Sequence, residues 1–285
     1  MAGLWKKFML WCFPPERFPE AFEEGYERLE ELGRGGYSVV YRVKKKTGER
    51  SGEIFAAKVV DVEKFSLKSA REEIETLQSF RDIDNVVRYV EHFEDEECHK
   101  VVIIMTVARG DNLFSIACNQ KLSEDLAKEI TRQLLVIIRQ CQDELQIVNG
   151  DLKLENLLVD LANPSSPVVT LIDLGSVQKA GKPVKGYTGS YVAPEAMGTN
   201  ATAEFPADMF SVGIFIYKIL ARGAAVKWAF PGPKIDLSLL SASDSAKELI
   251  KALATYDVKA RLTVTDALAH PWICGMDTGD IDIQM

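Results

Sequence analysis

The chain has 285 residues, of which 47% are hydrophobic and 27% charged, and its formal net charge is −8. This composition is ordinary for a globular protein of one or two domains, and the acidic balance argues against nucleic acid as a partner bound through bulk basicity. The five cysteines lack paired spacing and no apolar run is long enough to span a bilayer, so we expect no disulfide framework, no transmembrane segment and a cytoplasmic location.

The first 25 residues read as an N-terminal extension. Residues 1–13, MAGLWKKFMLWCF, are rich in aromatic side chains and are followed by two prolines. One interpretation is an interfacial membrane contact in which Cys12 is acylated, and the other is a segment packed against the domain. The two lysines in the stretch argue against a secretory signal, and we favour packing.

Residues 26–107 have the alternating pattern of β-strands, interrupted by one helical stretch at 66–80. A glycine-rich turn lies near the start, where residues 32–40 read LGRGGYSVV. Gly33 and Gly35 would let backbone N–H groups approach phosphates, whereas Ser38 stands where a third glycine is usual. Because a strand rather than a helix follows the turn, the pattern does not indicate a dinucleotide-binding motif.

A lysine follows an apolar run in the next strand, FAAK at 55–58. Alternation in a strand places Lys58 and Ala56 on the same face, under the glycine-rich turn. Glu73 on the following helix is our preferred partner for Lys58, with Glu72 and Glu75 as rivals. Such a pair would hold the ammonium group on bound phosphates.

Helical periodicity dominates after Gly110, in residues 123–142, 208–221 and 243–255. The chain therefore divides into a sheet-rich half and a larger helical half, which predicts an α+β fold with domains at 26–108 and 109–274 and a short acidic tail at 275–285.

Polar residues are embedded between apolar runs in the stretch IVNGDLKLENLLVD, residues 147–160. Asp151, Lys153 and Asn156 would be costly to bury unless they bind something. Asp173 follows another apolar strand, in VVTLIDLGS. The oxygen atoms of Asn156 and Asp173, together with phosphate oxygens, suit Mg²⁺, which is a hard cation.

These motifs together resemble the eukaryotic protein kinases over residues 26–274, nearest to the calcium/calmodulin-dependent group. The matching segments are LGRGGYSVV, FAAK, D-L-K-x-E-N, DLG, VAPE at 192–195, DMFSVG from position 208, and DVKARLTVTDALAHPWI at 257–273. The resemblance implies the two-lobed kinase fold, with an antiparallel sheet and one helix in the N-lobe and a mainly helical C-lobe. It also implies transfer of the ATP γ-phosphate to protein serine or threonine.

The resemblance implies a role for each matching position. Asp151 would accept the proton of the substrate hydroxyl, Lys153 would steady the γ-phosphate, and Thr188 would mark a serine/threonine acceptor. Lys58, paired with Glu73, would contact the α- and β-phosphates, while Asn156 and Asp173 would hold Mg²⁺. The implied ATP contacts are Leu32, Gly33, Arg34, Gly35, Gly36, Tyr37, Ser38, Val40, Ala56, Lys58, Met105, Val107, Glu155 and Leu158. Structural roles are implied for a Glu195–Arg261 pair and for Asp208 as a tether of the catalytic loop.

The chain departs from the family where an HRD motif is usual, because it has Asn149 and Gly150 before Asp151. The arginine that would hold an activation-segment phosphate is thus missing, and residues 177–186, VQKAGKPVKG, contain no serine, threonine or tyrosine. We therefore expect an active kinase that needs no phosphorylation in that stretch. The alternative is a pseudokinase that acts as an ATP-binding scaffold or allosteric module.

Partner expectations follow from the resemblance. Asn112 replaces an acidic residue that basic-directed relatives use, whereas Glu155, another such contact, remains, so basic proteins are one candidate substrate class. The stretch 221–243 is short for the family, which predicts a reduced or missing docking helix. Roughly ten residues follow Ile273, so direct calmodulin binding is not expected, and we expect a monomer.

Overall fold

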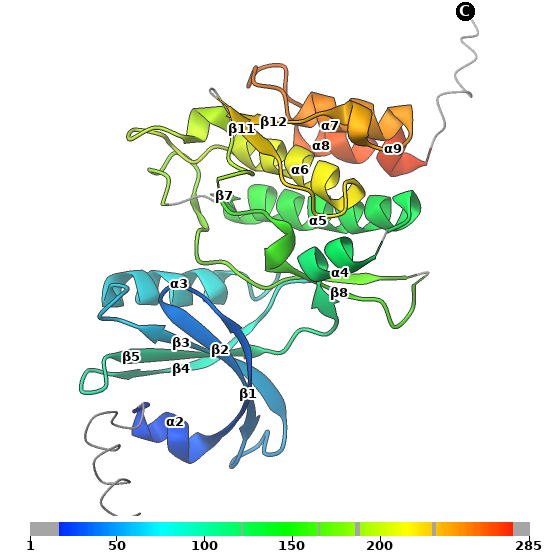
Figure 1. Cartoon of the computed structure of the whole chain (residues 1–285). Coiled ribbons are helices and arrows are strands. Elements are labelled where there is room, and N and C mark those ends of the chain that lie inside the picture. The colour runs from blue at the N-terminus through cyan, green and yellow to red at the C-terminus, as the bar shows by residue number, and fades with distance from the viewer. Residues whose placement is uncertain (1–16, 121, 165, 186–188, 230–231, 276–285) are drawn as a thin grey trace, which may run out of the picture. The chain divides into compact units, whose positions relative to one another are not determined.

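The computed structural model describes residues 17–120, 122–164, 166–185, 189–229 and 232–275 (Figure 1). Within these ranges the chain forms two compact units. The first comprises the chain up to Gln78 together with Arg88–Val107, and the second comprises Ser79–Val87 and the chain from Ala108 onward. Of the described helices, none combines the length and the apolar character that a bilayer crossing requires.

The first unit is built on a five-stranded antiparallel sheet in the order β1-β2-β3-β5-β4. Its strands are β1 (Tyr26–Arg34), β2 (Ser38–Lys45), β3 (Ile54–Asp61), β4 (Tyr89–Asp95) and β5 (Lys100–Thr106). The apolar residues Val86 and Val87 precede β4, which begins at Tyr89. The amide of Val87 donates to the carbonyl of Leu171, which ties residues 79–87 to the second unit.

One face of this sheet is covered by the short helix α2 (Glu20–Gly25) and the residues before it. Phe18 and Phe22 join a buried cluster with Phe55, Ala57 and Val59 of β3. Phe22 is fully buried and lies 5.9 Å from Phe93, centroid to centroid. The last residues of the predicted extension therefore form part of the hydrophobic core of the first unit, while residues 1–16 lie outside the described residues.

Helix α3 (Leu67–Ser79) lies on the opposite face of the sheet from α2 (Figure 1). It buries Ala70, Ile74 and Leu77, which recur at helical spacing. Arg71 donates to both carboxylate oxygens of Glu94 on β4, with the shortest contact at 2.7 Å. This bidentate pair and the apolar stripe together set the position of the helix, which agrees with the predicted span to one residue at each end.

The second unit is mainly helical. Its α-helices are α4 (Leu113–Asn119), α5 (Glu124–Leu145), α6 (Phe205–Leu220), α7 (Asp244–Leu253), α8 (Val264–Ala269) and α9 (Pro271–Cys274). The hydroxyl of Ser123 caps α5 and that of Ser243 caps α7, each accepting from an amide in the first turn. The apolar helix α6 is buried along most of its length, which makes it the centre of this unit.

Short strands of the second unit carry the loops discussed below. β8 (Leu157–Asp160) lies between β6 (Asp111–Asn112) and β9 (Val168–Leu171), and β7 (Ile147–Val148) pairs with β10 (Gln178–Lys179). The 3₁₀ turns are η1 (Leu154–Asn156), η2 (Pro194–Ala196) and η3 (Leu237–Leu239). In the described part of 221–243 the chain forms the hairpin of β11 (Lys227–Ala229) and β12 (Gly232–Lys234) with η3, and contains no α-helix.

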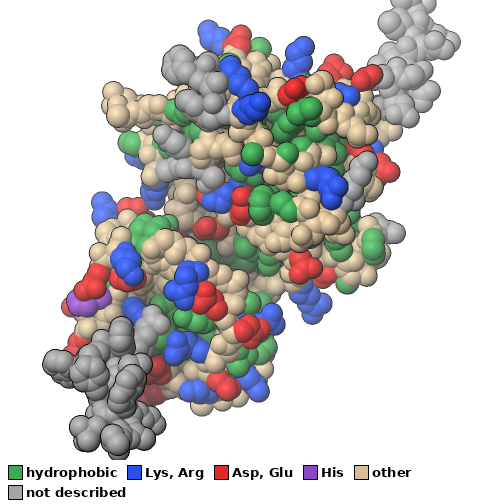
Figure 2. All heavy atoms as spheres, viewed as in Figure 1, with side chains coloured by type: hydrophobic (Ala, Val, Ile, Leu, Met, Phe, Trp, Pro, Cys, Tyr) green, Lys and Arg blue, Asp and Glu red, His purple; other side chains and the backbone are tan. Residues whose placement is uncertain are grey.

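The two units confirm the predicted α+β class, with an antiparallel sheet in one and helices in the other. The additional element is α2, which periodicity did not indicate because it is short. On the face shown in Figure 2, basic and acidic side chains are interspersed. Exposed ion pairs such as that of Arg50 with Glu53, at 2.8 Å, contribute little to stability.

Candidate functional site

The predicted ATP contacts of the first unit lie on four strands and in the turns beside them. They are Leu32, Gly33 and Arg34 on β1, Gly35, Gly36 and Tyr37 in the turn, Ser38 and Val40 on β2, Ala56 and Lys58 on β3, Met105 on β5, and Val107 just beyond it. The turn is closed by the amide of Gly35, which donates to the carbonyl of Ser38 at 2.8 Å. A methyl group added at Gly33 or Gly36 would meet no atom within 4 Å. The backbone there thus borders open space, as a phosphate-binding turn requires, and the individual contacts stay predictions.

Lys58 lies within β3 rather than at its end, and its ammonium group donates to Glu73 Oε1 at 2.5 Å. Both side chains are buried, with relative exposures of 8% and 6%. Because Phe55, Ala57 and Val59 point into the core cluster under α2, Lys58 and Ala56 lie on the other face, as strand alternation predicts. The structure thus selects Glu73 as the partner of Lys58 from among the three glutamates considered.

The second carboxylate oxygen of Glu73 differs from the first. Glu73 Oε2 is buried and has no hydrogen-bond partner among the described residues. A buried carboxylate oxygen without a partner is costly, which is typical of a functional position. Met105 and Ala56 are paired across β5 and β3 and are both buried. Met105 is therefore a core residue of the sheet, whatever its contact with a nucleotide.

The catalytic loop of the second unit runs from β7 to η1. The ammonium of Lys153 donates to Asp151 Oδ2 at 2.5 Å. The amide nitrogen of Asn156 donates to the backbone carbonyl of Asp151 at 2.9 Å and contacts its carboxylate at 3.3 Å. Of the three polar residues predicted from the sequence, Lys153 and Asn156 thus both contact the carboxylate of the third, Asp151.

Two oxygen donors for a cation lie next to this loop. The side-chain nitrogen of Asn156 is held by Asp151, which leaves the amide oxygen as the group that can bind a metal. The amide of Ile172 donates to the carbonyl of Asn156 at 3.0 Å, which holds Asp173 beside it, and Asp173 Oδ1 accepts from the amide of Gly175 at 3.0 Å. An amide and a carboxylate oxygen fit Mg²⁺, which completes its shell with phosphate and water oxygens. The described residues hold no cluster of three or more His, Cys, Asp or Glu that could bind a metal without such help.

A buried carboxylate, that of Asp208, binds the backbone of the catalytic loop. Asp208, on α6, accepts from the amide of Asn149 at 2.8 Å and from that of Gly150 at 2.9 Å. Burial raises the pKa of Asp208 to about 6, although the two amides act in the opposite direction. The predicted tether is confirmed, and it acts on the backbone of the two residues that depart from the family pattern.

Asn149 and Gly150 each have a structural role in this loop. The side-chain oxygen of Asn149 accepts from the amide of Asp151 at 3.1 Å, a turn that only a short polar side chain makes easily. Gly150 has φ of +76°, and a methyl group there would lie 3.2 Å from the carbonyl oxygen of Ser176. Asn149, which stands where the family usually has a histidine, thus accepts a hydrogen bond that positions Asp151.

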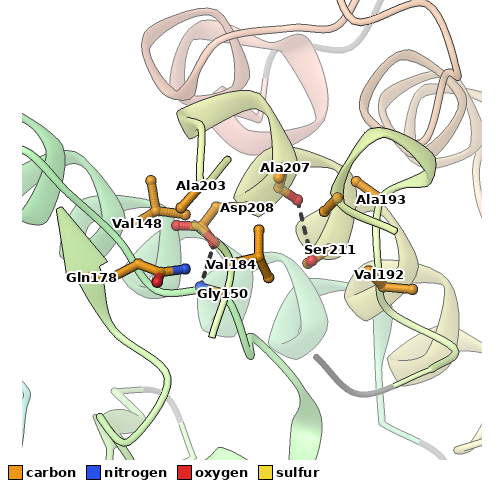
Figure 3. Close-up of a pocket in the computed structure, with 11 residues that line it drawn as sticks. Val148, Gly150, Gln178, Val184, Val192, Ala193, Ala203, Ala207, Asp208 and Ser211 are labelled. Atoms are coloured by element: carbon orange, nitrogen blue, oxygen red, sulfur yellow. Dashed lines mark hydrogen bonds between the residues drawn. The ribbon is translucent and has the colours of Figure 1, made fainter. Parts of the chain in front are cut away.

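A small cavity lies between the catalytic loop and β10 (Figure 3). Gln178 points into it, close to Gly150 and Asp208, and neither its amide nitrogen nor its amide oxygen has a hydrogen-bond partner among the described residues. The cavity volume is about 20 Å³, which suits one water molecule. Gln178 was not singled out from the sequence, because nothing in its local pattern marks it as buried.

Tyr191 contacts the part of the catalytic loop that follows Lys153, which we call the acceptor side of the site. Its hydroxyl accepts from the amide of Leu154 at 3.3 Å and contacts Glu155 Oε2 at 3.4 Å. The hydroxyl of Ser211 on α6 donates to the carbonyl of Tyr191 at 2.9 Å. Burial raises the pKa of Tyr191, so it stays protonated. The sequence did not mark Tyr191, which precedes the VAPE motif, because its partners are remote in the chain.

The other predicted residues are placed as follows. Arg261 donates to both carboxylate oxygens of Glu195, which confirms that structural pair. Asn112 caps α4 through its side-chain oxygen, and its amide donates to the carbonyl of Glu155 at 2.7 Å. Leu158 lies on β8 and is half-buried. Thr188 and the acylation candidate Cys12 lie outside the described residues.

Comparison with known proteins identifies the family. The protein kinase domain family matches residues 26–273. The chain is a member of the protein kinase family. It is 32% identical over 94% of its length to calcium/calmodulin-dependent serine/threonine-protein kinase 1 of Oryza sativa subsp. japonica, and 32% identical over 90% to CDPK-related kinase 1 of Arabidopsis thaliana. It is also 31% identical over 92% to death-associated protein kinase dapk-1 of Caenorhabditis elegans.

These similarities confirm the predicted resemblance to calcium-dependent serine/threonine kinases and the two-lobed fold class. The alignments span 47%, 47% and 19% of the three relatives, so this kinase chain matches about half or less of each. Protein kinases use ATP and Mg²⁺, and the open glycine-rich turn, the Lys58–Glu73 pair and the oxygen donors Asn156 and Asp173 fit those groups.

Proposed function

We propose that this chain is an active protein serine/threonine kinase whose catalytic loop works without phosphorylation of the activation segment. The observation that carries the proposal is the geometry around Asp151, whose carboxylate lies between the ammonium of Lys153 and the amide of Asn156. A carboxylate held in this way can accept the proton of a substrate hydroxyl group.

Each polar residue of the second unit has its own role in phosphoryl transfer. Asp151 accepts the hydroxyl proton as the substrate oxygen becomes a nucleophile, and Lys153 balances the negative charge beside it. Asn156 and Asp173 are the residues that would hold Mg²⁺. When bound, ATP supplies the phosphoryl group and Mg²⁺ offsets its negative charge.

In the first unit, Lys58 binds phosphate oxygens. Glu73 holds its ammonium group in a buried ion pair, so that little side-chain entropy is lost when phosphate binds. The open backbone at Gly33 and Gly36 offers N–H groups to the same phosphates. These contributions are positioning and charge stabilisation, which are the main protein contributions to phosphoryl transfer.

Independence from phosphorylation is supported by the way the activation segment is held. Its residues 177–186 contain no hydroxyl side chain, and Gly150 cannot bind a phosphate. The segment is instead fixed by the backbone. Residues of β10 pair with β7. The amide of Gly181 donates to the carbonyl of Ala203 at 2.9 Å, and the amide of Ala203 donates to the carbonyl of Lys182 at 2.8 Å. These bonds link the segment to the catalytic loop and to the start of α6 without a phosphate.

The amine of Lys179 adds a further link to the same region. It donates to the carbonyl of Leu145 at the end of α5, at 2.7 Å, and the amide of Ala180 donates to the carbonyl of Gln146 at 3.1 Å. Charge-assisted hydrogen bonds of this kind are stronger than neutral ones. The segment is thus fastened at β10 and directly after it.

The test is phosphate transfer by protein expressed in bacteria and shown by intact-mass measurement to carry no phosphate. We expect labelled phosphate to enter a generic protein substrate, and the Asp151→Asn variant to lose at least about a hundredfold in kcat. Asp236→Asn is the matched control, because Asp236 is an exposed cap of η3. If the unphosphorylated protein were inactive and gained activity after treatment with an upstream kinase, independence from phosphorylation would be wrong.

The alternative is a pseudokinase, which Asn149 and Gly150 favour because they replace family residues. It predicts that the protein binds ATP with a measurable affinity while wild type and Asp151→Asn show the same background transfer. Binding is measured by calorimetry with a non-hydrolysable ATP analogue, so the two functions give different results in one pair of experiments.

A further inference from the structure

Helix α6 contains two charged residues, Asp208 and Lys218, in an otherwise apolar or neutral sequence. Asp208 is explained by its bonds to the catalytic loop. Lys218 is nearly as buried, with a relative exposure of 7%. Its ammonium group donates to the hydroxyl of Ser190 at 2.9 Å and lies 4.2 Å from the ring centroid of Tyr191. None of the roles proposed above uses this lysine.

Desolvation makes the position of Lys218 unfavourable for a charged group. Burial lowers the pKa of Lys218, and the negative charge of Glu155 acts against that shift. A methionine or leucine would fill the same volume without a desolvation penalty. A buried amine that carries such a desolvation penalty is a candidate for a functional role.

The neighbours of Lys218 belong to the acceptor side of the site. Tyr191 stands between the ammonium of Lys218, over its ring, and Glu155, which contacts its hydroxyl. Through Leu154, whose amide donates to the same hydroxyl, the group adjoins the loop that carries Asp151. Lys218 therefore places a positive charge across the Tyr191 side chain from Glu155, the residue from which selection of basic peptides was expected.

Two opposite charges close together have small net influence on a third charge nearby. At the flanking residues of an acceptor peptide, the contributions of the two charges have opposite signs and largely cancel. Lys153 balances Asp151 in the same way, through their direct ion pair. The charges on this side of the site are thus matched in pairs, rather than in excess on the acidic side.

We propose that Lys218 is a specificity-determining residue that neutralises Glu155, so that this kinase does not select basic residues beside the acceptor hydroxyl. The proposal rests on the proposed kinase activity and names its substrate class: acceptor peptides whose residues next to serine or threonine are not selected by charge. It departs from the expectation, drawn from Glu155 by itself, that basic proteins are candidate substrates.

The experiment compares kcat/KM for acceptor peptides that differ in a single flanking residue, arginine, alanine or glutamate, at each upstream position. For wild type we expect the arginine-to-glutamate ratio to stay within about threefold of one. Lys218→Met should raise this ratio roughly tenfold, and Glu155→Gln should lower it by a similar factor, because each leaves one charge unmatched. The double variant should return near the wild-type ratio.

Lys234→Met is the matched control, because Lys234 stands 4.7 Å from the ring centroid of Tyr256 but is remote from the catalytic loop in sequence and is exposed. It should leave the ratio unchanged. An unchanged ratio in Lys218→Met, or a strong preference for arginine in wild type, would overturn the inference while leaving the kinase activity intact. Should Lys218→Met not fold, the shift of Glu155→Gln toward glutamate decides the question, since its absence contradicts the proposal. Lack of transfer to every peptide by wild type would overturn the proposed function and this inference with it.

Discussion

The two units hold their functional side chains in different ways. In the first unit one buried ion pair, Lys58 with Glu73, joins a strand to a helix. In the second unit Asp151 lies in a network in which Lys153, Asn156 and Asn149 all bond to it. A further carboxylate, Asp208, supports the backbone of that loop.

This difference has an energetic consequence. A buried ion pair depends on each partner, since removal of one leaves the other charge buried without its counter-charge. A network spreads its energy over several bonds, and the loss of one member is partly absorbed by the others. We therefore expect the first unit to be sensitive to charge removal and the second to backbone geometry.

The largest effect is expected for Lys58→Met. It leaves Glu73 buried without a counter-charge and should lower the free energy of unfolding by about 3–5 kcal/mol. The double variant Lys58→Met with Glu73→Leu should regain most of this loss, because both charges are gone. Urea unfolding measures the stability, and a phosphate-transfer assay should show no activity in either variant. If the single and double variants were equally unstable, the comparison between the two units would not hold.

A smaller effect is expected for Gly150→Ala. The left-handed backbone of Gly150, with φ of +76°, and the contact with the carbonyl of Ser176 should together cost about 1–2 kcal/mol of stability and displace Asp151. Gly48→Ala is the control, because Gly48 has φ of +83° with nothing within 4 Å of an added methyl group. Gly48→Ala should lose stability but keep the wild-type kcat, whereas Gly150→Ala should also lower kcat because Asp151 is displaced. Equal kcat in the two variants would mean that Gly150 has no part in placing the catalytic loop.

The smallest effect concerns pH. The pKa of Asp208 is raised to about 6 in the folded chain from an ordinary value of 3.8. The folded state therefore binds this proton more readily than the unfolded state between about pH 4 and 6, so this group adds stability as pH falls through that window. Protonation nevertheless weakens the bonds to Asn149 and Gly150, and kcat should fall as pH drops below about 6.

The measurement is a pH profile of kcat for wild type and Asp208→Asn. The variant cannot titrate at this position, so its profile should lose the part of the acid limb that Asp208 causes, while its maximum is lower because one backbone bond is lost. Identical acid limbs in the two proteins would show that Asp208 does not control the loop in this range.

Much of this site could be predicted from the sequence because its parts are local. Asp151, Lys153 and Asn156 lie within one short loop, and their polar side chains between apolar runs indicate a binding function without a structure. The pairing of Lys58 with a glutamate on the next helix was also predictable, although the choice of Glu73 needed the helix to be placed. Asp208 and the Glu195–Arg261 pair came from the family resemblance, and the structure confirmed them.

The sequence by itself thus determined the fold class, the family and the polar residues that follow strands, since strand alternation and motif order are properties of the chain. Tertiary structure decided what depends on residues far apart in that chain. It packed Phe18 and Phe22 onto the sheet of the first unit, turned Gln178 into a cavity beside Asp208, and set Lys218 against Tyr191 near Glu155. Burial and charge balance arise only when remote segments meet, so no local pattern could have shown them.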